Sequence, residues 1–361
     1  MVITGASTGI GRECALYLDR RGYRVFAGVR REEDGAALRA AASERLIPLL
    51  IDVTKKEQID EAAQLVGEAL GDKPLTGLVN NAGIGIAGPM EYIAIDDVRL
   101  QFEVNFFGPI VVTQAFLPLL RRGLGRIVNI GSAGGRFTAP FMAPYCASKS
   151  ALRALTEAQR MELRPWGIWA CLIEPGAIKT PIWDKGEATT RQIRGRLEGD
   201  ARERYVTSID ALSRGLPKFA KFAIPPERVA RRVEHALSAR RPKTNYLVGP
   251  DAYALALLRW LLPQRAFEWA LRKPMEFLCS ALRRAAQDEM TQPEQAHVER
   301  QVRHQPADEG RAVRAVEPSG ERHGRSDPSH DAPDHRGVGS PDRVPEVEET
   351  VESSEHTQRK V

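Results

Sequence analysis

The sequence predicts an α/β fold built on a doubly wound parallel sheet, and three observations lead to this prediction. Short apolar runs alternate with amphipathic stretches at close spacing through the first 250 residues. The first apolar run enters a glycine-rich loop, and a later stretch pairs Tyr145 with Lys149 at helical spacing. Such alternation favours parallel strands covered by helices on both faces. Because ligands bind at the carboxyl ends of these strands, we expect the functional residues there.

The composition divides the 361-residue chain into a basic globular part and an acidic tail. Residues 287–361 contain 10 Lys/Arg and 17 Asp/Glu, which leaves 42 basic and 30 acidic side chains, a charge of +12, before them. No Phe, Trp or Tyr follows Phe277, so the tail cannot bury enough apolar area to offset its ordering entropy. We therefore expect one globular domain over 1–249, a hydrophobic and basic helical extension over 250–286, and a disordered tail.

The cysteine and charge patterns argue against several classes of protein. Four widely spaced cysteines show no C-x-x-C or Cys/His metal pattern, so we expect reduced thiols, no metal site and a cytoplasmic protein. The opening apolar run leads straight into the glycine loop, so we expect no signal peptide. Lys and Arg are scattered without an aromatic-basic motif, which argues against nucleic-acid binding. The basic charge fits anionic cofactor phosphates or an anionic membrane surface equally well.

The first strand is expected at residues 1–4, directly before the glycine loop and a helix that ends near residue 22. Only four residues precede the loop, so we expect either that the strand starts upstream of them or that it is frayed. Glycines let the backbone approach a pyrophosphate, and free N–H groups at the start of a helix favour its negative charge. The loop residues expected to line a dinucleotide are Gly5, Ser7, Gly9, Ile10 and Gly11.

A second strand, over residues 23–29, ends next to Arg30. In dinucleotide-binding folds an acid here binds the adenosine ribose hydroxyls, whereas an arginine suits a 2′-phosphate. Val29 occupies the place of the acid, so we favour NADP(H). NAD(H) is the alternative if Glu32 or Glu33 serves the ribose instead.

Two more strands continue the alternation. The third, at 46–51, is followed by Asp52 and Val53 at the expected adenine edge and by a helix over 55–70. The fourth, at 75–79, ends in small residues that would let the backbone pass under a cofactor; the alternative is an Asn-rich turn. These residues are Asn80, Asn81, Ala82 and Gly83.

A long apolar helix is expected over 95–121 and carries Asn105. A buried amide without hydrogen-bond partners destabilises a fold by about 1–3 kcal/mol, so Asn105 is either a satisfied structural amide or part of a site. The fifth strand, at 125–130, places Ser132 just past its carboxyl end, thirteen residues before Tyr145.

Tyr145 and Lys149 lie four positions apart, so both project from one face of a helix that runs to about residue 164. A free phenol has a pKa near ~10, and a neighbouring cation favours the phenolate. We therefore expect Lys149 to lower the pKa of Tyr145, which could then exchange a proton with an alcohol oxygen. Alone, such a pair is more often two surface residues; the other motifs favour a site.

The last elements surround a stretch of weak periodicity. A strand at 169–173 leads into Pro175 and the residues after it, and residues 181–226 are expected to form a lid over the site. A helix at 226–239 and a strand at 244–248 complete the sheet.

Residues 255–284 interleave Leu, Trp and Phe with Arg and Lys. The stretch is too charged and too short to span a bilayer, which needs about 20 apolar helical residues. We expect it to pack against the core or a partner subunit, with peripheral contact with a membrane surface as the alternative.

Together these motifs resemble the short-chain dehydrogenase/reductase family over residues 1–249, and within it the steroid and retinol dehydrogenase-like branch. The resemblance implies a Rossmann-type fold and an NAD(P)-dependent oxidoreductase acting on CH–OH groups. It rests on motifs that occur in family order: Thr4, Gly5, Gly9 and Gly11; Asn80 to Gly83; Asn105; Ser132; Tyr145 and Lys149; Pro175, Gly176 and Thr180.

The resemblance also implies roles for single residues. Tyr145 would be the general acid/base, Lys149 would lower its pKa and bind the nicotinamide ribose, and Ser132 would hold the substrate oxygen. Asn105 would support a water-linked proton path to Lys149. Cofactor contacts would come from Asp52 to adenine, Asn80 to ribose and Thr180 to the carboxamide, with Val53, Ala82, Gly83, Pro175, Gly176 and Ile178 beside them.

The implied reaction interconverts an apolar, steroid- or retinoid-like alcohol and its ketone or aldehyde. The texture of residues 103–120 and 164–168 and the hydrophobic segment after Gly249 favour this substrate class. A 3-oxoacyl-thioester reductase is the alternative enzyme, and a cofactor-binding regulator without turnover or a protein that interacts mainly through its tail are alternatives of other classes. The resemblance further implies a homo-oligomer formed through the helices at 95–121 and 145–164.

Overall fold

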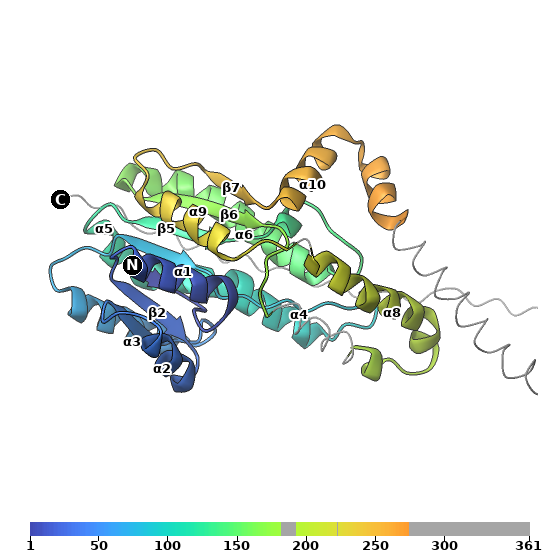
Figure 1. Ribbon diagram of the computed structural model, residues 1–361, viewed down its shortest axis with the longest axis horizontal. Coiled ribbons are helices and arrows are strands. Elements are labelled where there is room, and N and C mark those ends of the chain that lie inside the picture. Colours follow the sequence, from blue (N-terminus) through green and yellow to red (C-terminus); the bar gives the residue numbers. More distant parts are fainter. Residues whose placement is uncertain (182–192, 222, 274–361) are drawn as a thin grey trace, which may run out of the picture. The chain divides into compact units, whose positions relative to one another are not determined.

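The computed structural model describes residues 1–181, 193–221 and 223–273 (Figure 1). A seven-stranded sheet lies at the centre, with every neighbouring pair of strands parallel and the order β3-β2-β1-β4-β5-β6-β7. The order reverses between β1 and β4, so the predicted doubly wound α/β fold is confirmed. The strands are β1 (Val2–Ile3), β2 (Val25–Val29), β3 (Leu46–Leu50), β4 (Gly77–Asn80), β5 (Arg126–Ile130), β6 (Trp169–Pro175) and β7 (Asn245–Val248).

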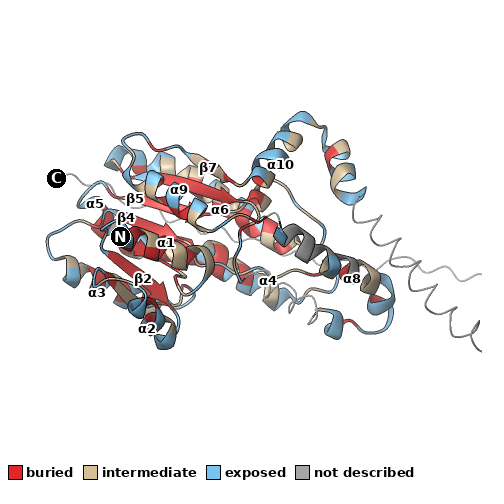
Figure 2. Ribbon diagram, viewed as in Figure 1, coloured by how far each residue is buried: buried red, intermediate tan, exposed pale blue. Residues whose placement is uncertain are grey.

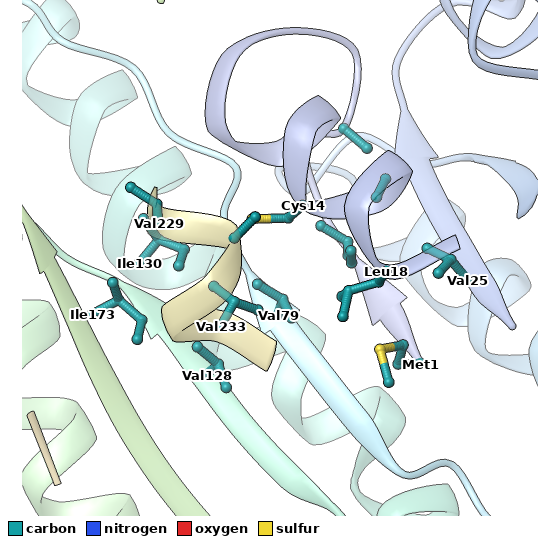
Figure 3. Packing of buried hydrophobic residues seen from close by; sticks show 14 of the residues in the cluster. Met1, Cys14, Leu18, Val25, Val79, Val128, Ile130, Ile173, Val229 and Val233 are labelled. Carbon is teal, nitrogen blue, oxygen red and sulfur yellow. The ribbon is translucent and has the colours of Figure 1, made fainter. Parts of the chain in front are cut away.

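Helices cover both faces of the sheet, and its central strands are mostly buried, whereas the edge strands β3 and β7 are only partly buried (Figure 2). One core cluster joins the sheet to α1 (Gly9–Arg20), α2 (Glu32–Ala40) and α9 (Glu227–Ser238). Figure 3 shows part of it, with Cys14 and Leu18 of α1 and Val229 and Val233 of α9. On the other face a second cluster includes side chains of α3 (Lys56–Leu70) and α5 (Gly108–Arg121), and α6 (Ala143–Leu163) packs there against β6.

The first strand is only two residues long, yet it is central. Val2 and Ile3 are fully buried and pair with β2 on one side and β4 on the other. Backbone bonds beyond the strand extend the pairing, from Phe26 N to Met1 O (2.8 Å) and from Thr4 N to Val79 O (3.0 Å). A very short strand can hold this place because neighbours on both sides satisfy its backbone groups.

The long helix after β4 contains one irregular turn. α4 (Ile95–Phe102) and α5 are joined by a π-helical turn, Glu103–Phe107, with Asn105 at its middle. Such turns are found mostly at functional sites. Among the described residues, Ile95–Arg121 is the one helix long and apolar enough to cross a membrane, and half of its most apolar window is buried inside the fold.

The region predicted as a lid contains a long helix in the structure, which the sequence did not predict. α8 (Gly199–Lys221) has 23 residues and follows a helical turn at 193–196. Ala201, Tyr205 and Ile209 share one face of α8 and pack near Leu197. Charged and polar residues surround these positions, which is why the sequence showed little apolar periodicity. The predicted lid residues 182–192 lie outside the described part.

Two helices follow β7, α10 (Pro250–Leu261) and one over 264–273. The expected packing against the core is limited, because Ala252 and Phe267 are the buried hydrophobic residues within this described stretch. Tyr253, Leu257 and Trp260 are exposed. The end of the predicted extension and the whole predicted tail lie outside the described residues.

Candidate active site

The predicted site residues meet at the carboxyl ends of the central strands. The glycine loop follows β1, the Asn80 to Gly83 stretch follows β4, Ser132 follows β5, and residues 176–180, here called the β6 loop, follow β6. Lys149 reaches the same edge from α6, because its Nζ donates to the carbonyl of Ile130 at 2.9 Å.

The glycine loop has the bare backbone that a pyrophosphate needs. Gly5 and Gly9 have positive φ values of +65° and +59°. A Cβ on Gly5 would lie 2.8 Å from the Ala82 Cα, and one on Gly11 would lie 2.2 Å from the Gly5 carbonyl oxygen. On Gly9 it would lie 3.3 Å from the Thr180 methyl, so the glycine loop and the β6 loop face each other. This cradle fits a dinucleotide.

Asn81 locks the glycine loop to the segment after β4. Its side-chain Nδ2 donates to the carbonyls of Thr4 (2.9 Å) and Gly5 (3.0 Å). In return the Thr4 hydroxyl accepts the backbone N–H groups of Asn81 (3.0 Å) and Ala82 (3.1 Å). Sequence reasoning treated Asn81 as part of a motif of small residues and missed this reciprocal pairing, which fixes both strand ends.

The Asn80 side chain points away from the glycine loop, and its predicted contact with the ribose stays a prediction. Its Nδ2 donates to Thr113 Oγ1 (3.1 Å) and Asn129 Oδ1 (2.8 Å), so the side chain faces α5 and β5 in a buried polar network. Strand alternation sends neighbouring side chains to opposite faces, which explains why this amide turns into the helix layer. The structure therefore does not bring the Asn80 side chain to the glycine loop.

The three residues expected near the adenosine, Asp52, Val53 and Arg30, have different environments. The Asp52 carboxylate accepts the N–H (3.0 Å) and hydroxyl (2.8 Å) of Thr54 and so closes a turn. Val53 is buried. Arg30 is exposed and has no side-chain partner among the described residues, whereas Arg31 forms two bonds to Asp34 at 3.1 and 3.3 Å.

Tyr145 lies deep in the site, and the direction of its pKa differs from the prediction. Burial raises the pKa of the phenol, and its hydrogen bond with Ser132 opposes the rise. Burial also lowers the pKa of Lys149 to about 8. The expected lowering of the Tyr145 pKa by Lys149 is not seen, because the ammonium donates to the Ile130 carbonyl and desolvation disfavours both charged forms.

Asn105 is a satisfied amide that joins two parts of the site. Its Oδ1 accepts the Ile84 N–H, and its Nδ2 donates to the Ile84 carbonyl and to Ser148 Oγ, at 2.9, 2.9 and 3.0 Å. Ser148 in turn donates to the Tyr145 carbonyl (2.8 Å). A Cβ on Gly83 would lie 3.4 Å from Asn105 Oδ1 and 3.5 Å from Lys149 Nζ. Sequence reasoning missed Ser148 although it precedes Lys149.

The loop after Ser132 is held by a buried ion pair that sequence reasoning also missed. Arg136 donates two hydrogen bonds to Glu174, at 2.8 and 2.6 Å, and the Glu174 side chain is fully buried. Glu174 belongs to β6, so the pair fastens the turn that carries Ser132 to the neighbouring strand. No local pattern marks two residues 38 positions apart as partners.

The β6 loop is held by three different segments. Gly176 N donates to Val248 O (2.8 Å) at the end of β7. Ala177 N donates to Asp251 Oδ2 (2.6 Å) at the start of α10. Lys179 N donates to Ile224 O at 2.9 Å.

A cavity of about 170 Å³ lies beside Tyr145, between the segment after Gly83 and the start of the lid. A Cβ on Gly85, one of its lining residues, would lie 3.7 Å from the Tyr145 ring. Asp97 and Arg196 form an ion pair of 3.0 Å at this cavity. Apolar or aromatic side chains make up much of the lining: Ile86, Pro89, Tyr92, Ile93, Ile193 and Leu197.

Three aromatic rings connect α8 to the walls of this site. Tyr205 of α8 makes edge contacts with Tyr92 (ring centroids 5.7 Å apart) and Phe141 (6.2 Å). Phe141 has a φ of +66°, a strained conformation for a bulky residue, and lies between Ser132 and Tyr145. The rings therefore join α8 to the segment between Ser132 and Tyr145.

Two comparisons place these features among known proteins. The family described as short chain dehydrogenase matches residues 1–191. Retinol dehydrogenase 5 of Mus musculus is 37% identical over 284 residues, covering 76% of this chain and 89% of its own length. Estradiol 17-beta-dehydrogenase 2 of Mus musculus is 38% identical over 288 residues, covering 76% of this chain and 74% of its own.

Solved structures agree with the sequence relatives. A short chain dehydrogenase from Burkholderia cenocepacia in complex with NADP is 27% identical, with a TM-score of 0.57, and the match covers 75% of this chain and 95% of that one. A short chain dehydrogenase/reductase from Burkholderia phymatum in complex with NAD is 28% identical, with a TM-score of 0.60, and the match covers 72% and 92%.

Proposed function

The chain belongs to the short-chain dehydrogenase family, and from this premise we propose that it interconverts an apolar alcohol and its ketone or aldehyde with NADP(H) as the preferred cofactor. It is an NAD(P)-dependent oxidoreductase of the branch related to retinol and steroid dehydrogenases. The observation that carries the proposal is that Ser132 and Tyr145 lie next to each other, near an apolar cavity and a glycine cradle. A Cβ on Gly134 would lie 3.4 Å from Ser132 Oγ and 3.5 Å from the Tyr145 ring.

The cofactor would lie along the strand ends. Gly5, Gly9 and Gly11 would pass under the pyrophosphate, and the β6 loop would flank the nicotinamide. When bound, the nicotinamide ring gives or takes the hydride of the reaction. The first-turn N–H groups of α1 would bind phosphate, since the Thr8 side chain forms no cap with them.

Tyr145 would transfer the proton that the reaction requires. Burial raises the pKa of the phenol, so Tyr145 keeps its proton at neutral pH. This state suits donation to a carbonyl oxygen, the proton transfer that reduction requires. Ser132 would hold the same oxygen and orient it towards the phenol.

Lys149 and Asn105 would support this transfer. The ammonium of Lys149 lies close to Gly83 and Asn105, and its pKa of about 8 leaves it mostly protonated at pH 7. It could therefore resupply a proton. Asn105 would keep the loop at Ile84 and the helix at Ser148 aligned around Lys149.

The apolar lining of the cavity supports a steroid- or retinoid-like substrate. Among the described residues that line this cavity, Arg196 is the one cation, and it is already paired with Asp97, so none of these residues offers a free positive charge to an anionic thioester carrier. A 3-oxoacyl-thioester reductase is therefore the weaker alternative. Turnover should be measured with NADPH and NADH against hydroxysteroids, retinoids, aliphatic ketones and acetoacetyl thioesters. Turnover of the thioesters alone would overturn the substrate class, and tight binding without any turnover would favour a regulator.

The proposal also covers how the chain associates with a second copy of itself and with a membrane. Apolar residues on α4, α6 and the π turn are exposed, as in a chain that pairs through these helices, and Leu100, Phe107 and Met161 are examples. We also propose that the described helices after Gly249 contact the surface of a membrane in the cytoplasm; residues 274–284 of the predicted contact lie outside the described residues. Tyr253, Leu257, Trp260 and Leu261, here called the apolar stripe, are exposed along one face of α10.

A further inference from the structure

We propose that Asp251 is a positioning residue for the nicotinamide half of the cofactor, an inference that rests on the proposed function. Asp251 lies in the first turn of α10, outside every motif of the family resemblance. Its Oδ2 nevertheless accepts the Ala177 N–H at 2.6 Å, across 74 positions of sequence. Ala177 is the second residue of the β6 loop.

The fold reserves space for this carboxylate. A Cβ on Gly176 would lie 2.2 Å from Asp251 Oδ2, and a Cβ on Gly249 would lie 2.5 Å from Oδ1. Gly249 also has a φ of +115°, which L side chains rarely adopt. A glycine thus follows each of the two strands beside the carboxylate, β6 and β7. No larger residue fits at either position while Asp251 keeps its place.

In this space the Asp251 carboxylate loses contact with water, which disfavours the folded state. Its Oδ1 is buried and has no hydrogen-bond partner among the described residues. Burying a carboxylate oxygen without a partner disfavours folding. The positive end of α10 offsets part of this cost, because Asp251 lies in the first turn of that helix. Helix capping alone does not require the reach to Ala177.

The bond to Ala177 controls where the rest of the β6 loop lies. Ala177 is held at both backbone groups, since its carbonyl accepts the Ile224 N–H at 3.0 Å. The next residues lead to Thr180, whose methyl packs against Gly9 of the glycine loop. A shift at Ala177 therefore moves Thr180 and the nicotinamide side of the site, whereas the glycine loop keeps its own bonds to Asn81. We infer that Asp251 sets the site for the nicotinamide and leaves the adenosine site unchanged.

The test compares two probes on the full chain. NADPH contains both halves of the cofactor, and 2′-phospho-ADP-ribose lacks the nicotinamide. We expect Asp251→Ala to weaken NADPH binding at least tenfold by titration calorimetry and to raise the KM for NADPH similarly. Binding of 2′-phospho-ADP-ribose should stay within twofold of wild type. Equal weakening of both probes, or of neither, would overturn the inference.

Two more variants separate positioning from helix capping. Asp251→Ser keeps a residue that favours a helix start but is too short to reach Ala177, so it should behave like Asp251→Ala. Asp251→Asn keeps both reach and acceptor and should restore most of the NADPH affinity. Restoration by serine instead would contradict the positioning role. These two variants also decide the matter if Asp251→Ala does not fold.

The control variant is Glu268→Ala, an exposed acid in the helix after α10, which should leave both affinities unchanged. Failure of the wild-type protein to bind NADPH would count against the proposed function itself. Binding by wild type with no selective loss in Asp251→Ala would count against the positioning role alone.

Discussion

At the level of single residues, the proposed reaction depends on the proton that Tyr145 carries. Tyr145→Phe keeps the ring and its packing but removes the hydroxyl that bonds to Ser132. We expect turnover to fall by about 10²–10⁴-fold, the usual contribution of a positioned acid or base. The affinity for NADPH, measured by fluorescence titration, should stay near that of wild type. Turnover near the wild-type rate would contradict the assigned role.

Arg30 tests the choice of cofactor. We expect Arg30→Ala to weaken NADPH binding by about 10–100-fold, the range for a lost hydrogen bond to a charged group, and to leave NADH binding nearly unchanged. Arg31→Ala is the matched control, because Arg31 is already paired with Asp34. Parallel losses for both cofactors in Arg30→Ala would show that the guanidinium does not read the 2′-phosphate.

The buried ammonium of Lys149 should make the free energy of unfolding depend on pH. Burial lowers its pKa from 10.5 to about 8 in the folded protein, so below pH 8 the fold holds a charged amine that it disfavours. The shift corresponds to about 3 kcal/mol at one pKa unit per 1.36 kcal/mol. As the pH rises from 8 to 10.5, the folded state loses this proton before the unfolded state does, and wild-type stability gains.

Lys149→Met should therefore have a higher Tm than wild type at pH 7, and the difference should narrow towards pH 10.5. The gain is reduced because the Ile130 carbonyl loses its donor. Thermal unfolding followed by circular dichroism between pH 7 and 10.5 checks this expectation. A lower Tm at pH 7 that does not change with pH would show that the ammonium stabilises the fold.

At the level of elements, the strands were predictable and the irregular turns were not. Buried parallel strands are continuous apolar runs, so β2, β3 and β5 begin and end within about two residues of their predicted bounds. The helix carrying Tyr145 and Lys149 was predictable from the four-residue spacing. α8 was not predicted, because charged and polar residues surround its buried positions. The π turn around Asn105 leaves no signal in apolar periodicity.

The site shows the same division. Residues that act through local geometry, such as Gly9 and Ser132, could be proposed from motifs. Partners that meet only through the sheet topology, such as Arg136 with Glu174 or Ala177 with Asp251, could not. The predicted direction of the Tyr145 pKa was wrong because it considered the nearby charge and not the depth of burial.

At the level of the whole molecule, the apolar stripe determines where the protein would reside. Burying Leu257 and Trp260 in a lipid surface would contribute a few kcal/mol, since a large apolar side chain is worth about 1.5–3 kcal/mol. The described helices after residue 249 also carry Arg265, an exposed cation that suits anionic headgroups. The four residues of the apolar stripe and Trp269 are the exposed large apolar side chains of these described helices. They are few for a stable protein interface, which needs about 20–30 residues a side.

The full chain should co-sediment with vesicles that contain anionic lipid, and the double variant Leu257→Ser with Trp260→Ser should lose at least tenfold in affinity. Leu65→Ser is the control, because Leu65 is an exposed apolar residue of α3, away from the stripe and from the proposed pairing helices. Turnover of a water-soluble carbonyl should not change in the double variant. Unaltered vesicle binding would rule out the stripe as the contact.

The π turn at Glu103–Phe107 also determines how the chain responds to the loss of a residue. A π turn holds one residue more than the α-helical turn it replaces, so a one-codon deletion there can leave a continuous α-helix. Because the extra residue is accommodated within that one turn, α4 and α5 would keep their register after such a deletion, and the change would be confined to Glu103–Phe107. Asn105 would then no longer face Ile84 and Ser148 together. Such an in-frame deletion would pass a screen for folded protein and be detected only by a screen for activity.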